Sequence, residues 1–191
     1  MRTLVKVLLL LIGLAVASVA QTPKAELGLD YNWMYSNHPP GGDTTFSMNG
    51  GSASLAWNVS QSFAVVGDVG GVHAADVPLT GQGLTVTSYV VGPRFYLRRK
   101  SAGAERRLFM PVPYGQVLLG GAHASGSLSG SGGGSSNAFA MKVGGGFEMP
   151  VSRRIVLRLA QTEYFLTLFP NGVNDRQNNF LFGAGVVLRL R

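Results

Sequence analysis

The sequence contains no cysteine, and this absence removes several classes of protein at once. Disulfide-stapled domains, thiol enzymes and zinc sites with cysteine ligands all need that side chain. An exported protein without disulfides has to obtain its stability from backbone hydrogen bonding and from burial of side chains.

Long apolar segments and charged residues are also scarce. After Ala20, no segment is apolar over the roughly 20 residues that a membrane-spanning helix needs. Charged residues make up 13% of the chain, although hydrophobic residues make up 46%. The net charge is +7, but the Lys and Arg residues form no single patch interleaved with aromatic residues. The sequence therefore predicts no nucleic-acid partner.

The first 20 residues have the three-part pattern of a secretory signal peptide. Two basic residues precede an apolar run from Val7 to Val19, and small residues flank the last position of that run. The run holds 13 residues and is too short to span a bilayer as a helix. We predict that residues 1–20 are a signal peptide cleaved after Ala20, and that residues 21–191 form one domain.

Alternation of apolar and polar residues is the main pattern in the rest of the chain. The stretch "AELGLDYNWMYS" (Ala25 to Ser36) alternates throughout and ends with Tyr31, Trp33 and Tyr35 on one face. Because the side chains of a strand point to opposite faces with period two, this stretch is a two-faced strand. The 27 glycines suit a tightly curved sheet better than helices, in which glycine is costly.

Eight alternating segments recur along the chain. We predict strands at about residues 25–36, 49–57, 62–72, 84–98, 108–121, 138–149, from 155 onward, and 178–190. Strict alternation in the seventh segment would move Gln161 and Glu163 onto the apolar face, so we predict a one-residue β-bulge near Ala160. Proline cannot donate to a β-ladder, so Pro111 and Pro113 should lie at the beginning of the fifth strand or at a bulge.

The intervals between the segments alternate as well. Long or glycine-rich intervals are expected at residues 38–46, 74–83, 120–137 and 169–177. They alternate with shorter turns, except that the basic interval at 98–107 is longer. An even number of strands with long loops at one end and short turns at the other is typical of outer-membrane barrels. We predict an all-β fold, an eight-stranded antiparallel up-and-down transmembrane β-barrel with both termini on the periplasmic side.

The size of the side chains indicates which face points outward. The lumen of an eight-stranded barrel is only wide enough to be filled by side chains, and here one face is bulky while the other is mainly Gly, Ala, Ser and Asn. Aromatic side chains gather at both membrane interfaces. We therefore predict an outward aromatic belt of Tyr31, Trp33, Tyr35, Trp57, Tyr89, Phe95 and Phe147.

The charged residues of the strands then belong inside the barrel. We predict a lumen charge network of Glu26, Asp30, Asp68, Arg94, Lys142, Glu148, Arg158 and Glu163. Unpaired charges are costly in a narrow lumen, so the acids and bases should pair and occlude it. A one-residue slip would put the three cations in lipid at roughly 2–4 kcal/mol each, so the strand register should be strongly fixed.

At this point the chain resembles a known family. The mature chain as a whole, and in particular the segments "SYVVGPRFYL", "YGQVLLGGAHA" and "NNFLFGAGVVLRLR", is similar to the small outer-membrane β-barrels of the OmpA/OmpX type. The resemblance implies a monomeric eight-stranded barrel with roles such as envelope stability or surface adhesion. It also implies insertion by the barrel assembly machinery.

The sequence offers little catalytic or metal-binding chemistry. His38, His73 and His123 fall in or beside the long loops without a fixed ligand spacing, so we predict no metal and no cofactor. His123 and Ser125 have the His-x-Ser spacing of barrel-type lipid A deacylases, in which a carboxylate orients the histidine. The next acid here is Glu148, and the Gly/Ser tract around His123 is expected to be too mobile to hold a base.

These observations favour a non-enzymatic integral protein in the outer membrane of a Gram-negative-type bacterium. Its partners are expected to be outer-membrane lipid and the barrel assembly machinery, and its long loops should be displayed outside the cell. Two alternatives remain open from the sequence. One is an exported soluble, lipocalin-like barrel that binds an apolar ligand, and the other is a lipid A-modifying barrel enzyme.

Overall fold

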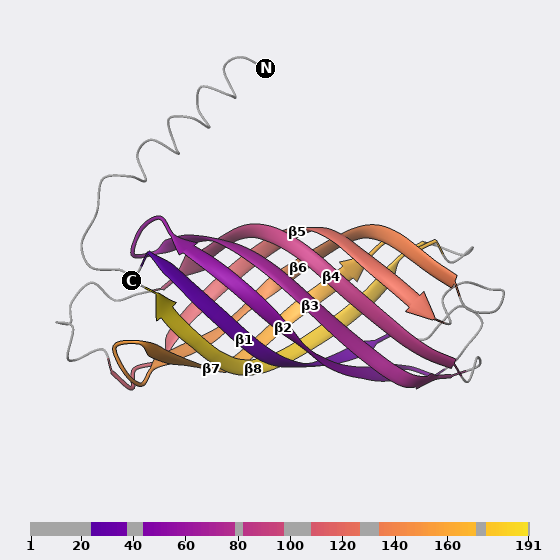
Figure 1. Ribbon diagram of the computed structural model, residues 1–191, viewed down its shortest axis with the longest axis horizontal. Helices are drawn as coiled ribbons and strands as arrows, with labels where there is room; N and C mark the ends of the chain where they lie inside the picture. Colours follow the sequence, from indigo (N-terminus) through magenta and orange to yellow (C-terminus); the bar gives the residue numbers. More distant parts are fainter. Residues whose placement is uncertain are drawn as a thin grey trace, which may run out of the picture.

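The computed structural model describes residues 24–37, 44–78, 82–97, 108–126, 134–170 and 175–190, which form a closed barrel (Figure 1). The predicted signal peptide lies outside the described residues. The barrel consists of eight strands in chain order: β1 (Ala25–Ser36), β2 (Phe46–Asn58), β3 (Phe63–Val77), β4 (Gln82–Tyr96), β5 (Val112–Gly126), β6 (Gly134–Pro150), β7 (Ile155–Thr167) and β8 (Gln177–Leu190).

Each strand pairs antiparallel with its neighbours in the sequence, and β1 closes the barrel against β8. The closing ladder runs from the pair Ala25 and Leu190 to the pair Ser36 and Asn179. The prediction of an all-β, eight-stranded, antiparallel up-and-down barrel is confirmed. Within the described ranges, no helix is long and apolar enough to cross a membrane.

The two ends of the barrel differ in their connections. One end, here called the terminal end, contains the start of β1, the end of β8 and the connections at 59–62, 97–111 and 151–154 (Figure 1, left). The other, the loop end, contains the connections at 37–45, 78–81, 127–133 and 168–176. We call the adjoining halves of the barrel the terminal half and the loop half.

Several predicted strand ends are wrong, most of them at the loop end. The interval predicted as a long loop at 74–83 is a connection of only four residues, because β3 continues to Val77 and β4 begins at Gln82. Ala74 and Val77 still point into the barrel, and the register shift between them absorbs the irregularity.

The Gly/Ser tract is also more ordered than predicted. β5 extends to Gly126 and β6 begins at Gly134, so residues 122–126 pair with residues 134–138. Glycine and serine remain compatible with strand geometry when a neighbouring strand accepts and donates their backbone hydrogen bonds.

At its other end, β5 starts at Val112 instead of residue 108. Val112 directly follows Pro111, which has no N–H for the ladder.

The predicted β-bulge in β7 is confirmed. The register of β7 shifts between Arg158 and Gln161 against β8, and the register of β6 against β7 shifts at the same level. Leu159 and Ala160 both face outward, so Arg158 and Gln161 both face the interior. The extra residue thus restores the polar side chains of β7 to the inside of the barrel.

Candidate functional site

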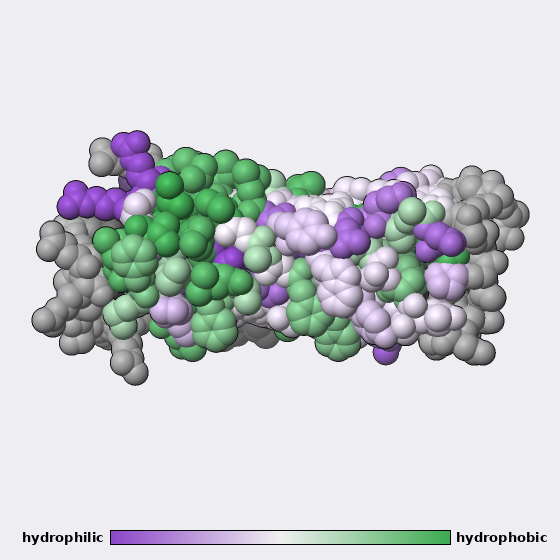
Figure 2. Space-filling model, turned by 90° about the horizontal axis from the view of Figure 1, so that it is seen from below, coloured by the Kyte–Doolittle hydropathy of each residue, from purple (hydrophilic) through white to green (hydrophobic). Residues whose placement is uncertain are grey.

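The exterior of the terminal half and of the middle of the barrel is apolar. Figure 2 shows hydrophobic side chains covering the part of the surface nearer the terminal end, and more polar side chains toward the loop end. Large apolar side chains remain strongly exposed here, for example Leu55 at 53%, Val69 at 58% and Val91 at 57%. Exposed apolar side chains on all sides of a barrel indicate contact with a non-aqueous environment.

The seven predicted belt residues all point outward, and they lie in two bands. Trp57, Phe95 and Phe147 lie near the terminal end of their strands and are at least half exposed. Tyr31, Trp33 and Tyr35 lie toward the loop end of β1, and Tyr89 lies at the middle of β4. The backbone alternation of the strands places all seven outside, because their neighbours in sequence face the lumen.

Local contacts orient the aromatic side chains at the middle of the barrel and nearer the loop end. The Trp33 ring contacts Phe182 on β8, with ring centroids 5.6 Å apart. The Tyr31 hydroxyl donates a hydrogen bond to Asn49 Oδ1 across β1 and β2, at 2.9 Å. The Tyr89 ring lies over Gly121, where an added Cβ would lie 2.6 Å from the ring. Phe182 was not among the predicted belt residues, although its position along β8 places it on the outward face. Gly121 is also outward and leaves room for the Tyr89 ring.

The interior of the terminal half is charged. All eight residues of the predicted lumen charge network are buried, with at most 7% of their surface exposed. Arg158 on β7 bridges two carboxylates, since it forms an ion pair with Asp30 and places Nη2 3.0 Å from Glu148 Oε1. Arg94 Nη1 lies 3.4 Å from the same Glu148 oxygen. These contacts join four strands across the lumen.

Two further ion pairs extend the network. Lys142 on β6 donates to Asp68 on β3 at 2.6 Å, and this contact crosses the barrel rather than following a neighbouring strand. Arg189 Nε donates to Glu26 Oε1 at 3.2 Å. Glu163 accepts a hydrogen bond from the Gln116 amide and forms no ion pair among the described residues.

Uncharged side chains that were not among the predicted site residues complete the network. Tyr114 lies beneath two guanidinium groups, with its ring centroid 4.6 Å from Arg94 Cζ and 5.7 Å from Arg158 Cζ. Its hydroxyl donates to Gln161 Oε1 at 2.6 Å. Arg94 Nε also donates to Gln116 Oε1 at 2.7 Å. Cation–π contacts and charge-assisted hydrogen bonds offset the desolvation of the arginines. The sequence contained one signal for these residues, because their alternating positions along the strands place them on the inward face.

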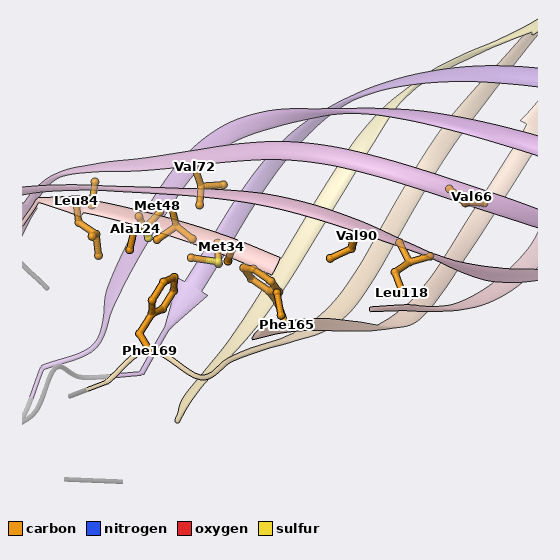
Figure 3. Packing of buried hydrophobic residues seen from close by; sticks show 14 of the residues in the cluster. Met34, Met48, Val66, Val72, Leu84, Val90, Leu118, Ala124, Phe165 and Phe169 are labelled. Carbon is orange, nitrogen blue, oxygen red and sulfur yellow. The ribbon is translucent and has the colours of Figure 1, made fainter. Parts of the chain in front are cut away.

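The interior of the loop half is mainly apolar, apart from a few buried polar side chains at the strand ends, such as Ser36 and Asn179. Met34, Met48, Phe165 and Phe169 are almost completely buried there, together with small and branched residues of β3, β4 and β5. Figure 3 shows these four side chains gathered together inside the barrel, with Leu84, Val72 and Ala124 around them. Phe169 lies beyond the end of β7 and is held in place by Gln177, which bonds both its N–H and its carbonyl.

The exterior of the loop half is polar along β2 to β6. Asn49, His73, Thr85, His123 and Asn137 all lie on outward positions of these strands. His73 Nδ1 lies 2.9 Å from Thr85 Oγ1, and His123 Nδ1 lies 2.9 Å from Asn137 Oδ1. We call these five residues the polar collar.

The third histidine, His38, lies outside the described residues. The part of the chain that is described contains no group of three or more His, Cys, Asp or Glu suited to a metal.

The surroundings of His123 differ from the sequence-based expectation. His123 and Ser125 belong to β5, so they are held on a paired strand rather than in a mobile tract. Both face outward. The side chain that orients His123 is the Asn137 amide on β6, not a carboxylate. The Gly/Ser tract around His123 is therefore not too mobile to hold a base, contrary to the expectation from the sequence.

Comparison with known proteins identifies the architecture. No protein-family model and no curated protein matches the sequence. Among solved structures, the chain is similar to Neisserial surface protein A (NspA), with a TM-score of 0.68 and 15% identity over 87% of this chain and 97% of that one. At this identity the likeness concerns the fold.

Two further solved structures share this architecture. Ail, the attachment invasion locus protein of Yersinia pestis, has a TM-score of 0.50 and 14% identity, covering 86% of this chain and 99% of that one. The outer membrane protein OprG from Pseudomonas aeruginosa has a TM-score of 0.50 and 10% identity, covering 88% and 97%. The chain therefore has the eight-stranded barrel fold found in outer-membrane proteins.

Proposed function

We propose that this chain is a non-enzymatic integral protein of the outer membrane of a Gram-negative-type bacterium. The observation that carries the proposal is the polarity of the terminal half, where charged residues lie inside and aromatic and aliphatic residues lie outside. A soluble barrel needs the opposite arrangement. In lipid, a closed barrel pairs the backbone N–H and C=O groups of its strands in continuous ladders, and this arrangement turns apolar side chains toward the hydrocarbon.

The same proposal covers export and assembly. Residues 1–20 direct the chain across the inner membrane and are removed after Ala20. The barrel assembly machinery then inserts a monomer, with the terminal end in the periplasm and the loop end outside the cell. The connections at the loop end are displayed as a surface for interaction with other molecules or as part of the envelope structure. No cofactor is required for this role.

The lumen of the proposed protein is closed to ions. The ion pairs of Arg158, Arg94 and Lys142 cross the terminal half, and the Met34, Met48, Phe165 and Phe169 cluster fills the loop half. An ion would have to break buried charge pairs and also pass an apolar segment, and both steps are costly.

Four measurements test this proposal. The full chain should fractionate with carbonate-washed outer membranes and migrate faster on a detergent gel when unheated. Mass analysis of the exported chain should give an N-terminus at residue 21. Purified protein in liposomes should give no conductance above that of empty liposomes. Recovery of the folded protein in the soluble periplasmic fraction would contradict the membrane assignment, and steady conductance would contradict the closed lumen.

A second function, hydrolysis of a lipid ester at the outer leaflet, is favoured by one observation. The Asn137 Oδ1 accepts a hydrogen bond from His123 Nδ1, which leaves Nε2 of that ring as a base. Ser125 lies two residues further on the same outward face of β5. A serine, a histidine and an orienting amide are the parts of a hydrolytic triad with Asn in the place of the carboxylate.

His73 offers a matched control for this second function, because it is also an outward histidine whose Nδ1 meets a cross-strand side chain. If His123 is the base, His123→Ala should lower deacylation of lipid A by at least about 100-fold, whereas His73→Ala should leave it unchanged. Absence of deacylation by the wild-type protein, or equal loss in both variants, would exclude this function.

A further inference from the structure

Large apolar side chains remain exposed beyond the aromatic band at the terminal end. Leu97 directly follows β4, two residues beyond Phe95, and is 74% exposed. Phe109 and Met110 lie shortly before β5 and are 65% and 48% exposed. Aromatic bands mark the level at which hydrocarbon gives way to lipid headgroups, so these three side chains lie at the headgroup level. Large apolar side chains gathered around one connection indicate an interaction surface.

The backbone of Phe109 is held in an unfavourable conformation. Its φ of 62° lies in the left-handed region, which bulky residues rarely adopt. The Phe109 N–H donates to the Pro150 carbonyl at 2.8 Å, so this connection is fixed to the end of β6. Strained residues persist where the surrounding structure enforces them, and they cluster at functional sites. Here the enforced conformation leaves a large ring exposed, which favours a contact outside the chain.

The turn between β6 and β7 brings positive charge to the same place. Pro150, to which Phe109 is bonded, directly precedes this turn. Arg153 and Arg154 lie in the turn and are both exposed. Ser152 Oγ accepts a hydrogen bond from the Arg154 N–H at 3.2 Å, so the turn has a defined shape. An ordered pair of arginines therefore adjoins the connection that contains Phe109.

The exposed charges of the two barrel ends differ in sign. Among the described residues, the fully exposed charges at the terminal end are all basic, namely Lys24, Arg153 and Arg154. The exposed acids of the same described ranges, Asp76 and Asp175, lie at the loop end. Complementarity of charge therefore favours an anionic partner at the terminal end.

We propose that the terminal end binds an anionic phospholipid of the periplasmic leaflet through Phe109, Met110, Arg153 and Arg154, here called the terminal docking surface. The two guanidinium groups bind the lipid phosphate, and Phe109 and Met110 contact the glycerol and the first carbons of the acyl chains. This inference rests on the proposed function, because it requires a barrel in the membrane with its terminal end in the periplasm. It adds a preference for one class of lipid.

The chemistry of the terminal docking surface fits such a lipid. The planar guanidinium group of arginine matches two phosphate oxygens at once. A surface that combines apolar side chains with cations binds at membrane interfaces, through burial of apolar area and attraction to anionic lipid. The surface also continues the apolar exterior of the terminal half, which the proposed function places in lipid. An acidic protein partner would match the charges but not this continuity.

Quenching of tryptophan fluorescence by brominated lipids measures which lipid lies next to a chosen position. The full chain carries Trp33→Phe and Trp57→Phe, so that one introduced tryptophan is the only reporter. Phe147→Trp reports on β6 near the terminal end, and Phe139→Trp is a matched reporter on the same strand nearer the loop end. Each protein is folded into phosphatidylcholine vesicles with equal amounts of brominated phosphatidylglycerol or brominated phosphatidylcholine.

The two reporters should give different results. At Phe147→Trp, phosphatidylglycerol should associate at least about fivefold more strongly than phosphatidylcholine at low salt, because a single basic residue near an anionic surface contributes about that factor. Added NaCl should reduce the preference by screening. At Phe139→Trp, the two brominated lipids should quench equally.

Variants of the terminal docking surface locate the effect. Arg153→Gln combined with Arg154→Gln should make the two lipids quench equally at Phe147→Trp. Arg176→Gln, which removes an exposed base at the loop end, should leave the preference unchanged. Phe109→Trp as the only reporter should be quenched by brominated lipid and shielded from acrylamide in the water.

The outcomes separate this inference from the proposed function. A preference at Phe147→Trp that is lost in the double arginine variant, together with a shielded Phe109→Trp, supports the docking surface. Equal quenching by both lipids at Phe147→Trp overturns the inference and leaves the membrane assignment intact. So does a preference that survives loss of both arginines, or a Phe109→Trp fully open to acrylamide. Failure of either brominated lipid to quench Phe147→Trp would contradict the membrane assignment itself.

Discussion

The two halves of the barrel have opposite polarity. In the terminal half, Arg94 and Glu148 face inward while Phe95 and Phe147 next to them face outward. In the loop half, Met48 faces inward while its neighbour Asn49 faces outward. The alternation of apolar and polar residues thus continues along a strand. Near the middle of the barrel, however, the apolar residues change from the outward face to the inward face.

This exchange indicates where the surroundings of the barrel change. An apolar exterior matches hydrocarbon, and a polar exterior over an apolar interior matches water. On β2 to β6, the boundary between the apolar and the polar exterior lies on the terminal side of the polar collar. On β1 and β8 the aromatic side chains Tyr35 and Phe180 continue close to the loop end, so the boundary is not at the same residue level on every strand.

The largest effect is expected for Arg158→Met. The substitution leaves Asp30 and Glu148 buried without their shared cation, which should cost about 3–5 kcal/mol of unfolding free energy. Urea unfolding in detergent micelles measures this cost. A triple variant that also carries Asp30→Asn and Glu148→Gln should recover most of the loss. A cost below about 1 kcal/mol for the single variant would contradict a charged, closed terminal half.

A somewhat smaller effect is expected in the apolar loop half. Met48 is fully buried, so Met48→Ala should leave a cavity and cost about 3 kcal/mol, whereas Met48→Leu should cost less than about 1.5 kcal/mol. The same unfolding assay applies. If Met48→Ala were neutral, the loop half would not contain a packed interior, and the contrast between the two halves would disappear.

A paired substitution on β6 tests the boundary itself. Val143 and Ser135 both face outward on this strand, Val143 in the apolar region and Ser135 in the loop half. Val143→Arg should destabilise the protein folded in lipid by about 2–4 kcal/mol, and Ser135→Arg by about 0–1 kcal/mol. Equal costs at the two positions would mean that both lie in the same solvent, which would refute the boundary proposed for β6.

The smallest effect is expected at the boundary, for Tyr31→Phe. The variant loses the hydrogen bond from the Tyr31 hydroxyl to Asn49 Oδ1 and keeps the ring, which should cost about 0.5–1 kcal/mol. A double-mutant cycle with Asn49→Ala isolates the contact. Additive effects in that cycle would show that the bond contributes nothing to stability.

Much of the fold could be predicted from local pattern. The first strand, the number of strands and the bulge near Ala160 follow from period-two alternation, which is a property of consecutive residues. Strand ends were predicted less well, because Asp76 and the Gly/Ser tract have weak strand propensity. Pairing with a neighbouring strand overrides this propensity, as it does for His123 and Ser125.

The lumen charge network could also be predicted only in part. Inward parity along each strand assigned Glu26, Lys142 and Arg158 to the lumen, and no distant contact was needed for that. The choice of partners was not predictable. Lys142 forms an ion pair with Asp68 across the barrel, and Arg158 forms ion pairs with two carboxylates on two different strands. These contacts exist because closure of the sheet brings distant strands close together.

The sequence by itself determined that this chain forms eight two-faced strands and which residues share a face, because side-chain direction in a strand depends only on position along the chain. The tertiary structure decided which charges pair, where the two faces exchange their roles, and why Asp30 and Asn32 keep a free oxygen. Those features depend on the curvature and closure of the sheet, which set the distances between residues far apart in the sequence.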